Sequence, residues 1–255
     1  MAGSREFEGR SVIVTGGGSG IGRAAALRFA AAGGKVLIAD LNGQAAKEAA
    51  EEIAAAGGTA RTVAGDLSEQ GVVDEVVRTA VDAHGGIDVL VNNAGIMDSM
   101  SAAADVEDAE WERLLRINLT APFLLTRAAL PHMLEAGRGA VVNTASEASL
   151  RGSAAGTAYT VAKHGVVGLT KSVAIMYRDR GVRANAIAPG GTITNIRVDA
   201  EQGAHGPGVV GSYMHNIGRA SEADEQAAAI VFLASDAASN INGVVLPVDN
   251  GWSAV

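Results

Sequence analysis

Thr15-Gly-Gly-Gly-Ser-Gly-Ile-Gly22 is the stretch of sequence that decides the fold. It follows an apolar run, Ser11–Thr15, and opens an alanine-rich segment with helical spacing, Gly20–Ala31. A glycine-rich turn between a strand and a helix lets a phosphate group approach the backbone, and the helix N-terminus supplies N–H donors and the positive end of a dipole. The turn therefore predicts a pyrophosphate site at the first strand-to-helix connection of an α/β sheet.

The spacing of the glycines leaves the chemistry open. It is Gly16-x-x-x-Gly20-x-Gly22 rather than the more common G-x-G-x-x-G. A flexible turn without a ligand would have the same composition, and methyltransferases also carry a glycine-rich first turn. The motif predicts a bound nucleotide without naming the reaction.

Apolar runs alternate with longer helical patterns along the whole chain, and several of the runs are continuous, as in strands buried on both faces. This alternation predicts an α/β fold: a single-domain, doubly wound, Rossmann-like sheet of about seven mainly parallel strands with helices on both faces. We expect residues 1–255 to form one dinucleotide-binding and catalytic domain. The predicted strands are Ser11–Thr15, Lys35–Ala39, Ala60–Ala64, Val89–Asn92, Ala140–Thr144, Arg183–Ile187 and Val244–Val248, and the predicted helices are Gly20–Ala31, Gly43–Ala56, Glu69–His84, Val106–Glu135, Ala158–Arg178 and Glu222–Ser235.

Composition excludes several classes of function. The net charge is −8 and lysine and arginine form no run, so we expect no nucleic-acid partner. There is no cysteine, which rules out disulfides and thiolate chemistry, and the five histidines do not pair with carboxylates at ligand spacing, so we expect no metal. The first ten residues lack the apolar core of a secretory signal and no apolar stretch reaches the length of a membrane span, which predicts a cytoplasmic protein without a membrane partner.

Asp40 ends the second predicted strand, 18 residues after Gly22. An acidic residue at about this distance accepts hydrogen bonds from the adenosine ribose and repels a 2′-phosphate. Its neighbours Ser19 and Leu41 are not basic, although Arg23 is near. The position favours NAD over NADP as cofactor. An aspartate that only caps a turn would occupy the same place.

Tyr159 and Lys163 lie four residues apart on one predicted helix, so the phenol and the ammonium share a face. This pair alone is weak, because it is common on solvated helices. Ser146 ends the fifth predicted strand, where a doubly wound sheet binds its ligands. Asn118 lies inside a long predicted helix, where a polar amide often marks a kink.

In these features the chain resembles the short-chain dehydrogenase/reductase family over essentially its whole length. Each motif is weak alone, but the whole set in this order is specific. The matching residues are Thr15-Gly16, Gly20-Ile-Gly22, Asp40, Asp66-Leu67, Asn92-Asn-Ala-Gly95, Asn118, Ser146, Tyr159, Lys163, Pro189-Gly190 and Thr194.

The resemblance implies a role for each matching residue. Tyr159 would be the general acid/base, Ser146 would hold the substrate oxygen, and Asn118 would order a water in a proton relay. Lys163 would bind the nicotinamide ribose and favour ionisation of Tyr159. The other implied cofactor-binding residues are Gly16, Ser19, Gly20, Ile21 and Gly22 at the turn, Asp40 and Leu41 at the adenosine ribose, Asp66 and Leu67 at the adenine, Asn93, Ala94 and Gly95 along the ribose, and Pro189, Gly190, Thr192 and Thr194 at the nicotinamide and phosphates.

The physics of the tyrosine fits that role. A phenol with a pKa near 10 is too weak a base at neutral pH, and lowering the pKa by about three units needs about 4 kcal/mol. A cation about 4 Å away supplies about that much at an effective dielectric near 20. Lys163, together with the positive ring of an oxidised nicotinamide, is therefore expected to lower the pKa of Tyr159.

The sequence departs from the family at the rim of the substrate pocket. Glu147 stands where a small or apolar residue is usual, Ser149 replaces a frequent glycine, and Thr192 takes an aliphatic position. Asp249-Asn250-Gly251 replaces a frequent Asp-Gly-Gly. These changes leave the reaction type in place and put the identity of the substrate in doubt.

Two further expectations concern a loop and the assembly. Thr194–Ala220 has no clear secondary structure and contains five glycines, so we predict a substrate lid in which Tyr213, Met214, His215 and Ile217 cover the substrate. The two longest predicted helices carry more apolar residues than one sheet face can cover, and the resemblance implies two-fold interfaces that build a homotetramer or a dimer.

The leading interpretation is an oxidoreductase that transfers a hydride between NAD(H) and a small-molecule secondary alcohol or ketone. A second enzyme remains open: an NADPH-dependent 3-oxoacyl-thioester reductase. From another class, a dinucleotide-binding sensor without turnover also remains open, although the complete set of polar residues argues against it.

Overall fold

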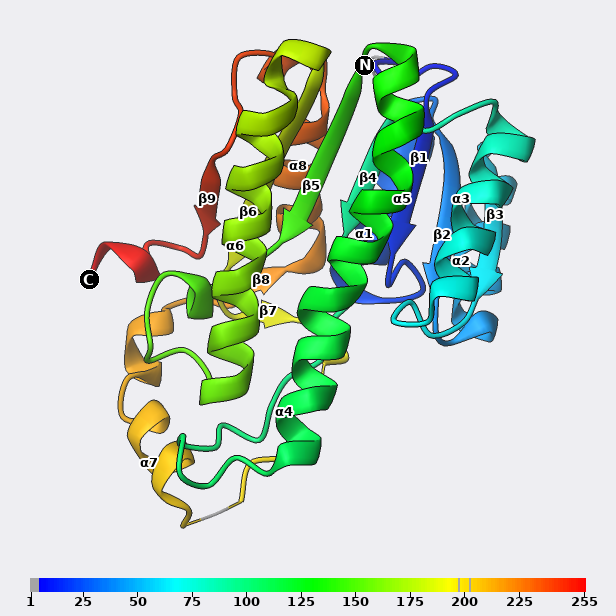
Figure 1. Cartoon of the computed structure of the whole chain (residues 1–255). Coiled ribbons are helices and arrows are strands. Elements are labelled where there is room, and N and C mark those ends of the chain that lie inside the picture. Colours follow the sequence, from blue (N-terminus) through cyan, green and yellow to red (C-terminus); the bar gives the residue numbers. More distant parts are fainter. Residues whose placement is uncertain (1–4, 197, 202) are drawn as a thin grey trace.

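Among the residues described, seven parallel strands form the central sheet, in the order β3-β2-β1-β4-β5-β6-β9 (Figure 1). The structure is a computed structural model that describes residues 5–196, 198–201 and 203–255. Residues 1–4, at the start of the chain where a targeting signal was considered, lie outside the described residues. So do positions 197 and 202 of the expected lid. The strands are β1 (Ser11–Thr15), β2 (Lys35–Asp40), β3 (Thr59–Ala64), β4 (Val89–Asn92), β5 (Gly139–Thr144), β6 (Val182–Pro189) and β9 (Val245–Val248), with a separate parallel pair of β7 (Thr192–Ile193) and β8 (Ser221–Glu222).

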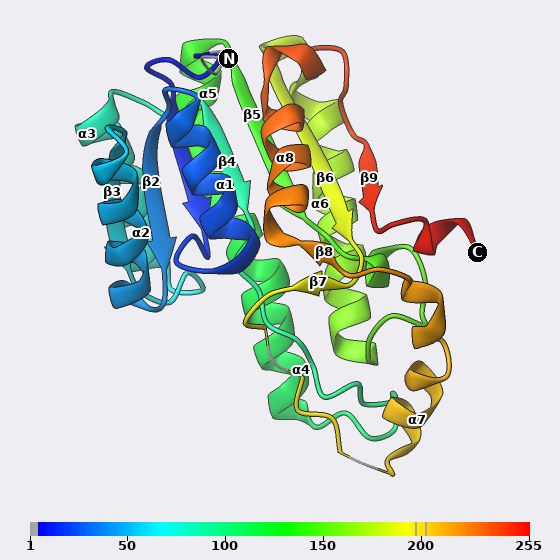
Figure 2. The ribbon, with the colours of Figure 1, turned by 180° about the vertical axis from the view of Figure 1, so that it is seen from behind.

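Helices cover both faces of the sheet, because successive side chains of a strand point to opposite faces. In β1, Ile13 packs into one core layer with α3, α5 and α6, whereas Val12 and Val14 pack into the other with α1, α2 and α8. Figure 1 shows α5 and α6 over the first face, and Figure 2 shows α1 and α8 over the second. The α-helices are α1 (Gly20–Ala31), α2 (Gly43–Ala55), α3 (Gln70–His84), α4 (Asp108–Leu115), α5 (Ala121–Ala136), α6 (Thr157–Tyr177), α7 (His205–Gly211) and α8 (Ala223–Ala234).

The order of strands reverses beside β1, because the chain runs outward to β2 and β3 on one side and then returns to place β4 on the other. Ligands of doubly wound sheets bind in the crevice at such a switch point, outside the carboxyl ends of the strands. The ends of β1, β4, β5 and β6 therefore position the site.

One predicted helix is wrong as drawn. The continuous helix expected over Val106–Glu135 is divided into α4, a π-helical turn at Arg116–Thr120 and α5. Asn118 lies in the middle of that turn, at the point where the sequence indicated a kink. A π-turn inserts an extra residue into the helix, which lets one side chain take a direction that a regular helix would not allow.

The segment Thr194–Ala220 is also more ordered than the sequence suggested. It contains α7 and a 3₁₀ helix, Met214–Ile217. Figures 1 and 2 show this segment below the carboxyl ends of the strands, with α7 near the loop that precedes α4. Shorter 3₁₀ turns occur at Glu147–Ser149, Arg178–Arg180, Asp236–Ala238 and Trp252–Ala254.

Within the part of the chain that the structure describes, every helix is too short or too polar to cross a membrane.

Candidate active site

A cavity of about 710 Å³ lies at the carboxyl ends of the strands. We call it the main cavity. Of the residues expected to bind cofactor, every one except Gly22 lines it. Ser146, Tyr159 and Lys163 line it as well, whereas Asn118 is fully buried and lies outside its lining. The structure thus brings together residues that are spread over most of the sequence.

The glycine turn forms one end of the main cavity. Gly16 and Gly20 have φ values of +63° and +51°, which side chains rarely adopt. A Cβ on Gly16 would lie 2.9 Å from Cα of Ala94, so the turn and the loop after β4 are in backbone contact. Ser19 begins α1 without a side-chain cap, which leaves N–H groups of the first turn free to bind an anion.

Gly22 does not line the cavity but allows α1 to pack closely against the end of β1. A Cβ at this position would lie 2.2 Å from the carbonyl oxygen of Gly16 and 2.6 Å from Nδ2 of Asn93. The start of α1 therefore rests directly on the end of β1, which is the role of the last glycine in a dinucleotide-binding turn.

The sequence left open whether Asp40 faces a cofactor site or only caps a turn, and in the structure it bonds turn N–H groups and also lines the main cavity. Its carboxylate accepts hydrogen bonds from the N–H groups of Gly18, at 2.9 Å, and Asn42, at 2.8 Å. Arg23, the nearest candidate for a phosphate-binding cation, forms an ion pair with Glu52. The carboxylate of Asp40 is thus the charged group that the structure presents on this part of the wall.

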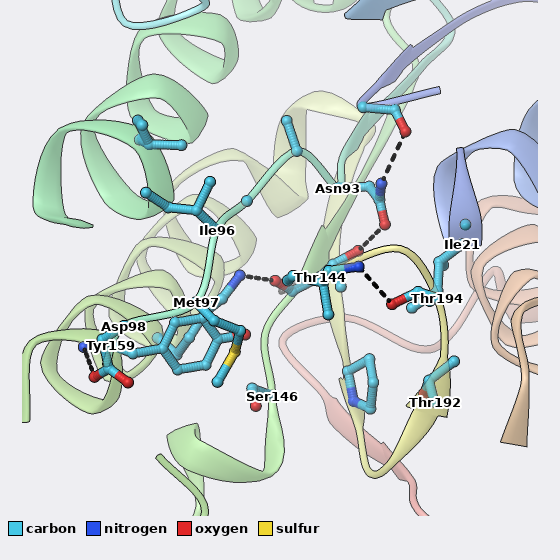
Figure 3. A pocket seen from close by; sticks show the side chains of 18 of the residues that line it. Ile21, Asn93, Ile96, Met97, Asp98, Thr144, Ser146, Tyr159, Thr192 and Thr194 are labelled. Carbon is cyan, nitrogen blue, oxygen red and sulfur yellow. Dashed lines mark hydrogen bonds between the residues drawn. The ribbon is translucent and has the colours of Figure 1, made fainter. Parts of the chain in front are cut away.

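Asp66 and Asn93 are two further polar residues in the wall of the main cavity. The hydroxyl and the N–H of Ser68 donate to Asp66 and hold the pKa of its carboxyl below the ordinary value, and Arg116 adds an ion pair at 2.8 Å. Asn93 donates from Nδ2 to the carbonyl oxygen of Thr15 at 3.1 Å and accepts from the hydroxyl of Thr144 at 3.3 Å (Figure 3). These bonds lock the carboxyl ends of β1, β4 and β5 together.

Ser146 and Tyr159 meet at the inner end of the main cavity (Figure 3). Ser146 follows β5, and its oxygen accepts from the N–H of Ala148 at 3.1 Å. Tyr159 lies in the first turn of α6 with 7% of its surface exposed. Burial raises the pKa of Tyr159 to about 12. The side chain of Ser146 acts to lower this pKa, and the charge of Asp98 acts to raise it.

Lys163 lies one turn further along α6. Its Nζ donates to the carbonyl oxygen of Thr144 at 2.8 Å and lies 5.4 Å from the centre of the Tyr159 ring. Burial lowers the pKa of Lys163 to about 8. Burial of the phenol is the largest influence on the pKa of Tyr159, and the ammonium of Lys163 is directed at a backbone carbonyl. The lowering expected from Lys163 together with an oxidised nicotinamide stays a prediction.

Asn118 is held between the loop after β4 and α6. Its Oδ1 accepts from the N–H of Ile96 at 3.0 Å and its Nδ2 donates to the carbonyl oxygen of the same residue at 2.9 Å. A Cβ on Gly95 would lie 2.7 Å from Oδ1 of Asn118 and 3.6 Å from Nζ of Lys163. Only a glycine fits between the amide and the ammonium.

A family model for short chain dehydrogenases matches residues 10–204. The chain belongs to this family. It is thus an oxidoreductase with a Rossmann-like, nucleotide-binding fold, and the short-chain dehydrogenase resemblance read from the sequence is confirmed.

Relatives of this short-chain dehydrogenase align over nearly the whole chain. The 3beta-hydroxysteroid dehydrogenase 2 of Eggerthella lenta is 43% identical over 248 residues, which are 96% of this chain and 95% of the relative. The cyclohexanol dehydrogenase of an Acinetobacter species is 36% identical and covers 98% of both chains. A proposed NAD(P)-dependent gluconate 5-dehydrogenase from Beutenbergia cavernae, solved with NADP at low occupancy, superposes with a TM-score of 0.87 at 39% identity, over 99% of this chain and 100% of that one.

The sequence did not identify every polar group beside the site of this dehydrogenase. Asp98 lines the main cavity with 3% of its surface exposed, and no motif marked it. Glu147 was noted only as a departure from the family. It is buried, lies 3.0 Å from Arg151, and has a pKa raised to about 7 by burial and by Asp249. Asp98 bonds Gly156 and Tyr159, and Glu147 is affected by Asp249, so the partners that matter are distant in sequence and local patterns carry no signal for them.

The outer part of the main cavity has an apolar wall. Ile96 and Met97 contribute from the loop after β4, Met214 and Ile217 from the 3₁₀ helix of the expected lid, and Trp252 from the C-terminal segment. Two of the four predicted covering residues thus line the cavity. The other two do not, since Tyr213 is 46% exposed and the ring of His215 bonds the carbonyl oxygen of Ser212. Among the described residues, no group of three or more acidic or histidine side chains is placed to hold a metal ion.

Proposed function

We propose that the chain transfers a hydride between NAD(H) and a secondary alcohol or ketone, with Tyr159 as the general acid/base. The observation that carries the proposal is the position of Ser146, Tyr159 and Lys163 at the inner end of the same cavity whose other end is the glycine turn. A dinucleotide with its pyrophosphate at the turn has its nicotinamide end directed toward these three residues.

The proton step follows from the surroundings of Tyr159. A buried phenol whose pKa is about 12 is a proton donor, which suits protonation of the oxygen formed when a ketone is reduced. Ser146, which lines the same end of the cavity as Tyr159, holds that oxygen in place. Alcohol oxidation needs the phenolate, so a positive charge close to the ring has to lower the pKa of Tyr159 in the loaded enzyme.

A nicotinamide cofactor held by these residues would supply or accept the hydride, and its oxidised form would add a positive charge that favours the phenolate of Tyr159. The residues present fit such a group, because the glycine turn has no room for side chains and offers free N–H donors. Lys163 uses one of its three donors on Thr144 and has two left for ribose hydroxyls. Asn118 retains one N–H and one lone pair for a water that continues a proton path from Lys163.

NAD is the proposed cofactor. A 2′-phosphate on the adenosine ribose would lie against the carboxylate of Asp40, and the nearest arginine, Arg23, is paired with Glu52. Leu41 is 76% exposed and offers no charge. The relative from Beutenbergia cavernae was solved with NADP, so this preference is a property of these residues and not of the family.

The proposed substrate is a ring-shaped secondary alcohol or its ketone. The apolar wall of Ile96, Met97, Met214, Ile217 and Trp252 suits a hydrocarbon frame, while Ser146 and Tyr159 supply the polar end. The names of two relatives, a hydroxysteroid dehydrogenase and a cyclohexanol dehydrogenase, support the same class. No feature of the site favours a 3-oxoacyl thioester.

Three further parts of the proposal concern the setting of the site. Residues 194–220 act as its lid within a single domain of residues 1–255. Exposed apolar side chains on the helices that flank the π-turn and on α6, including Trp111, Phe123 and Val161, support assembly into a homotetramer or dimer. The location proposed is the cytoplasm.

The test is a panel of secondary alcohols and ketones offered with NAD(H) and NADP(H), followed by the absorbance of the reduced nicotinamide. We expect turnover of ring alcohols with NAD, and loss of that turnover in Tyr159→Phe. A chain that binds NADH and turns over nothing on the panel would support a sensor instead.

A further inference from the structure

Asp98 is a buried carboxylate in the loop between β4 and α4. Its Oδ1 accepts from the N–H groups of Met100, at 3.0 Å, and Gly156, at 3.2 Å, and its Oδ2 accepts from the N–H of Tyr159 at 3.1 Å (Figure 3). The side chain therefore joins the loop to the first turn of α6.

These bonds are those of a helix cap supplied from another part of the chain. The first N–H groups of a helix lack partners inside it, and a side-chain oxygen of the N-cap residue usually binds one of them. The N-cap of α6 is Gly156, which has no side chain. A Cβ there would lie 2.6 Å from Oδ2 of Asp98, so the glycine leaves the space that the carboxylate occupies.

The loop that carries Asp98 is itself held in a strained form. Met100 has a φ of +59°, which is uncommon for a residue with a side chain. Glu110 of α4 accepts from the N–H of Ser99 at 2.8 Å and from the hydroxyl of Ser101 at 3.1 Å. The N–H of Thr157 donates to the carbonyl oxygen of Ser101 at 3.0 Å, which gives the loop a second link to α6.

The same loop also supports the lid. A Cβ on Gly206 of α7 would lie 2.2 Å from the carbonyl oxygen of Met100, so the two backbones are in direct contact. Any shift of the loop would therefore reach both α7 and the turn of α6 that bears Tyr159.

We propose that Asp98 is a positioning residue for the reaction, which caps α6 from outside the helix and thereby fixes Tyr159 against Ser146. The inference rests on the proposed function of Tyr159. A strained backbone conformation persists only where surrounding bonds hold it, and such conformations cluster at functional sites. Asp98 accepts a hydrogen bond from the N–H of the strained residue, Met100. Catalysis is sensitive to this position, because misplacement of a reacting group by about 1 Å lowers turnover by about a hundredfold.

The charge of Asp98 adds a signature that a purely structural cap would lack. The charged groups around Tyr159 are Asp98, with Glu110 beside it, and Lys163, whose Nζ lies 5.4 Å from the centre of the ring. Burial raises the pKa of Asp98, with Glu110 acting in the same direction, and the carboxylate of Asp98 raises the pKa of Tyr159. Removal of that charge should lower the pKa of Tyr159.

The test compares Asp98→Asn, which keeps the size of the side chain and removes its charge, with Glu112→Gln, which removes an exposed carboxylate of α4. We expect Asp98→Asn to lower kcat by about tenfold or more, with the Kd of NADH changed by less than about twofold. Glu112→Gln should retain kcat. Wild-type turnover in Asp98→Asn, or a parallel loss of NADH binding and turnover, would overturn the proposal.

A second measurement needs no substrate and separates this inference from the proposed function. The chain has three tyrosines, so NMR titration of ring-labelled tyrosine can follow Tyr159 once Tyr159→Phe has assigned its signal. The midpoint for Tyr159 should move to lower pH in Asp98→Asn and not in Glu112→Gln. An unmoved midpoint in Asp98→Asn would overturn the role of Asp98, even if the panel of alcohols shows no turnover.

Discussion

Lys163 donates a hydrogen bond from Nζ to the carbonyl oxygen of Thr144 at 2.8 Å, which joins α6 to the end of β5. The bond fixes the ammonium at the floor of the main cavity, and the side chain is only 4% exposed. Because a buried cation without a charged partner is unfavourable, its retention at this position indicates a function for its remaining donors.

Replacement of Lys163 by methionine keeps the apolar stem and removes those donors. Each charge-assisted hydrogen bond to a ribose hydroxyl contributes about 1.5–3 kcal/mol, so we expect the Kd of NAD to rise at least about tenfold and turnover to fall further. Lys171→Met is the matched control, because Lys171 is exposed on the same helix. Titration calorimetry with NAD measures the first effect, and unchanged affinity in Lys163→Met would remove the lysine from the cofactor site.

Cofactor preference should depend on Asp40 and on the pairing of Arg23. Asp40→Asn keeps the size of the side chain and removes the charge that would face a 2′-phosphate. We expect the ratio of kcat/KM for NADP over NAD to rise about tenfold, as about 1.4 kcal/mol of repulsion is lost. Adding Glu52→Gln frees Arg23 and should raise the ratio again, whereas Asp82→Asn, at an exposed position on α3, should leave it unchanged. A wild-type enzyme that already uses both cofactors equally would contradict the assignment.

The sequence predicts most of this fold because strands buried on both faces have an unmistakable pattern. β1 and β4 have the predicted bounds, and the other strands of the central sheet differ by at most two residues at either end, whereas the short strands β7 and β8 were not predicted. The two errors of substance have physical causes. The π-turn at Arg116–Thr120 keeps helical periodicity on both sides, and α7 is a short helix rich in glycine that depends on its contact with Met100.

In the candidate site, too, the sequence predicts the residues that belong to local motifs and misses those whose partners are distant. Residues that belong to a local motif, such as Tyr159 with Lys163, were predicted, and they line the cavity. Asp98 bonds residues that follow it by 58 and 61 positions, and Glu147 meets a carboxylate near the other end of the chain. Burial, which raises the pKa of Tyr159, likewise has no signature in the spacing of residues.

The carboxyl group of Glu147 should make stability depend on pH. Burial and Asp249 raise its pKa from 4.5 to about 7, while the pKa of Asp249 is lowered. The folded protein keeps the proton of Glu147 where the unfolded chain has released it. The stability it contributes is therefore complete below about pH 4.5 and is lost as the pH rises through about 7.

Glu147→Gln removes that titration, since its neutral amide can still donate to Asp249. We expect the free energy of unfolding of the wild type to fall relative to that of Glu147→Gln, by up to about 1 kcal/mol per pH unit. Denaturant titrations at several pH values between about 4.5 and 7 measure the difference. Glu51→Gln, at an exposed position of α2, controls for the loss of a carboxylate. Parallel stability curves for wild type and Glu147→Gln would contradict the raised pKa of Glu147.

The lid should act on the substrate and not on the cofactor. Met214→Ala removes an apolar side chain from the cavity wall, and burial of such a side chain contributes about 1.5–3 kcal/mol. We expect KM for a ring alcohol to rise about tenfold, with the Kd of NAD unchanged. Val209→Ala is the control, because Val209 belongs to the same segment but is 46% exposed and outside the cavity lining. Equal KM values for the two variants would leave the segment without a part in substrate binding.

The proton-transfer role of Tyr159 is the central claim, and the most direct measurement pairs turnover with cofactor binding in Tyr159→Phe. The change removes one oxygen from a side chain that is 7% exposed, so the fold and the glycine turn remain. Tyr177→Phe, at the last residue of the same helix, is the control. We predict that Tyr159→Phe lowers kcat by about 10²- to 10⁴-fold, as expected for loss of a general acid/base, while NADH still binds with the affinity of the wild type. Turnover within a few-fold of the wild type would contradict the account.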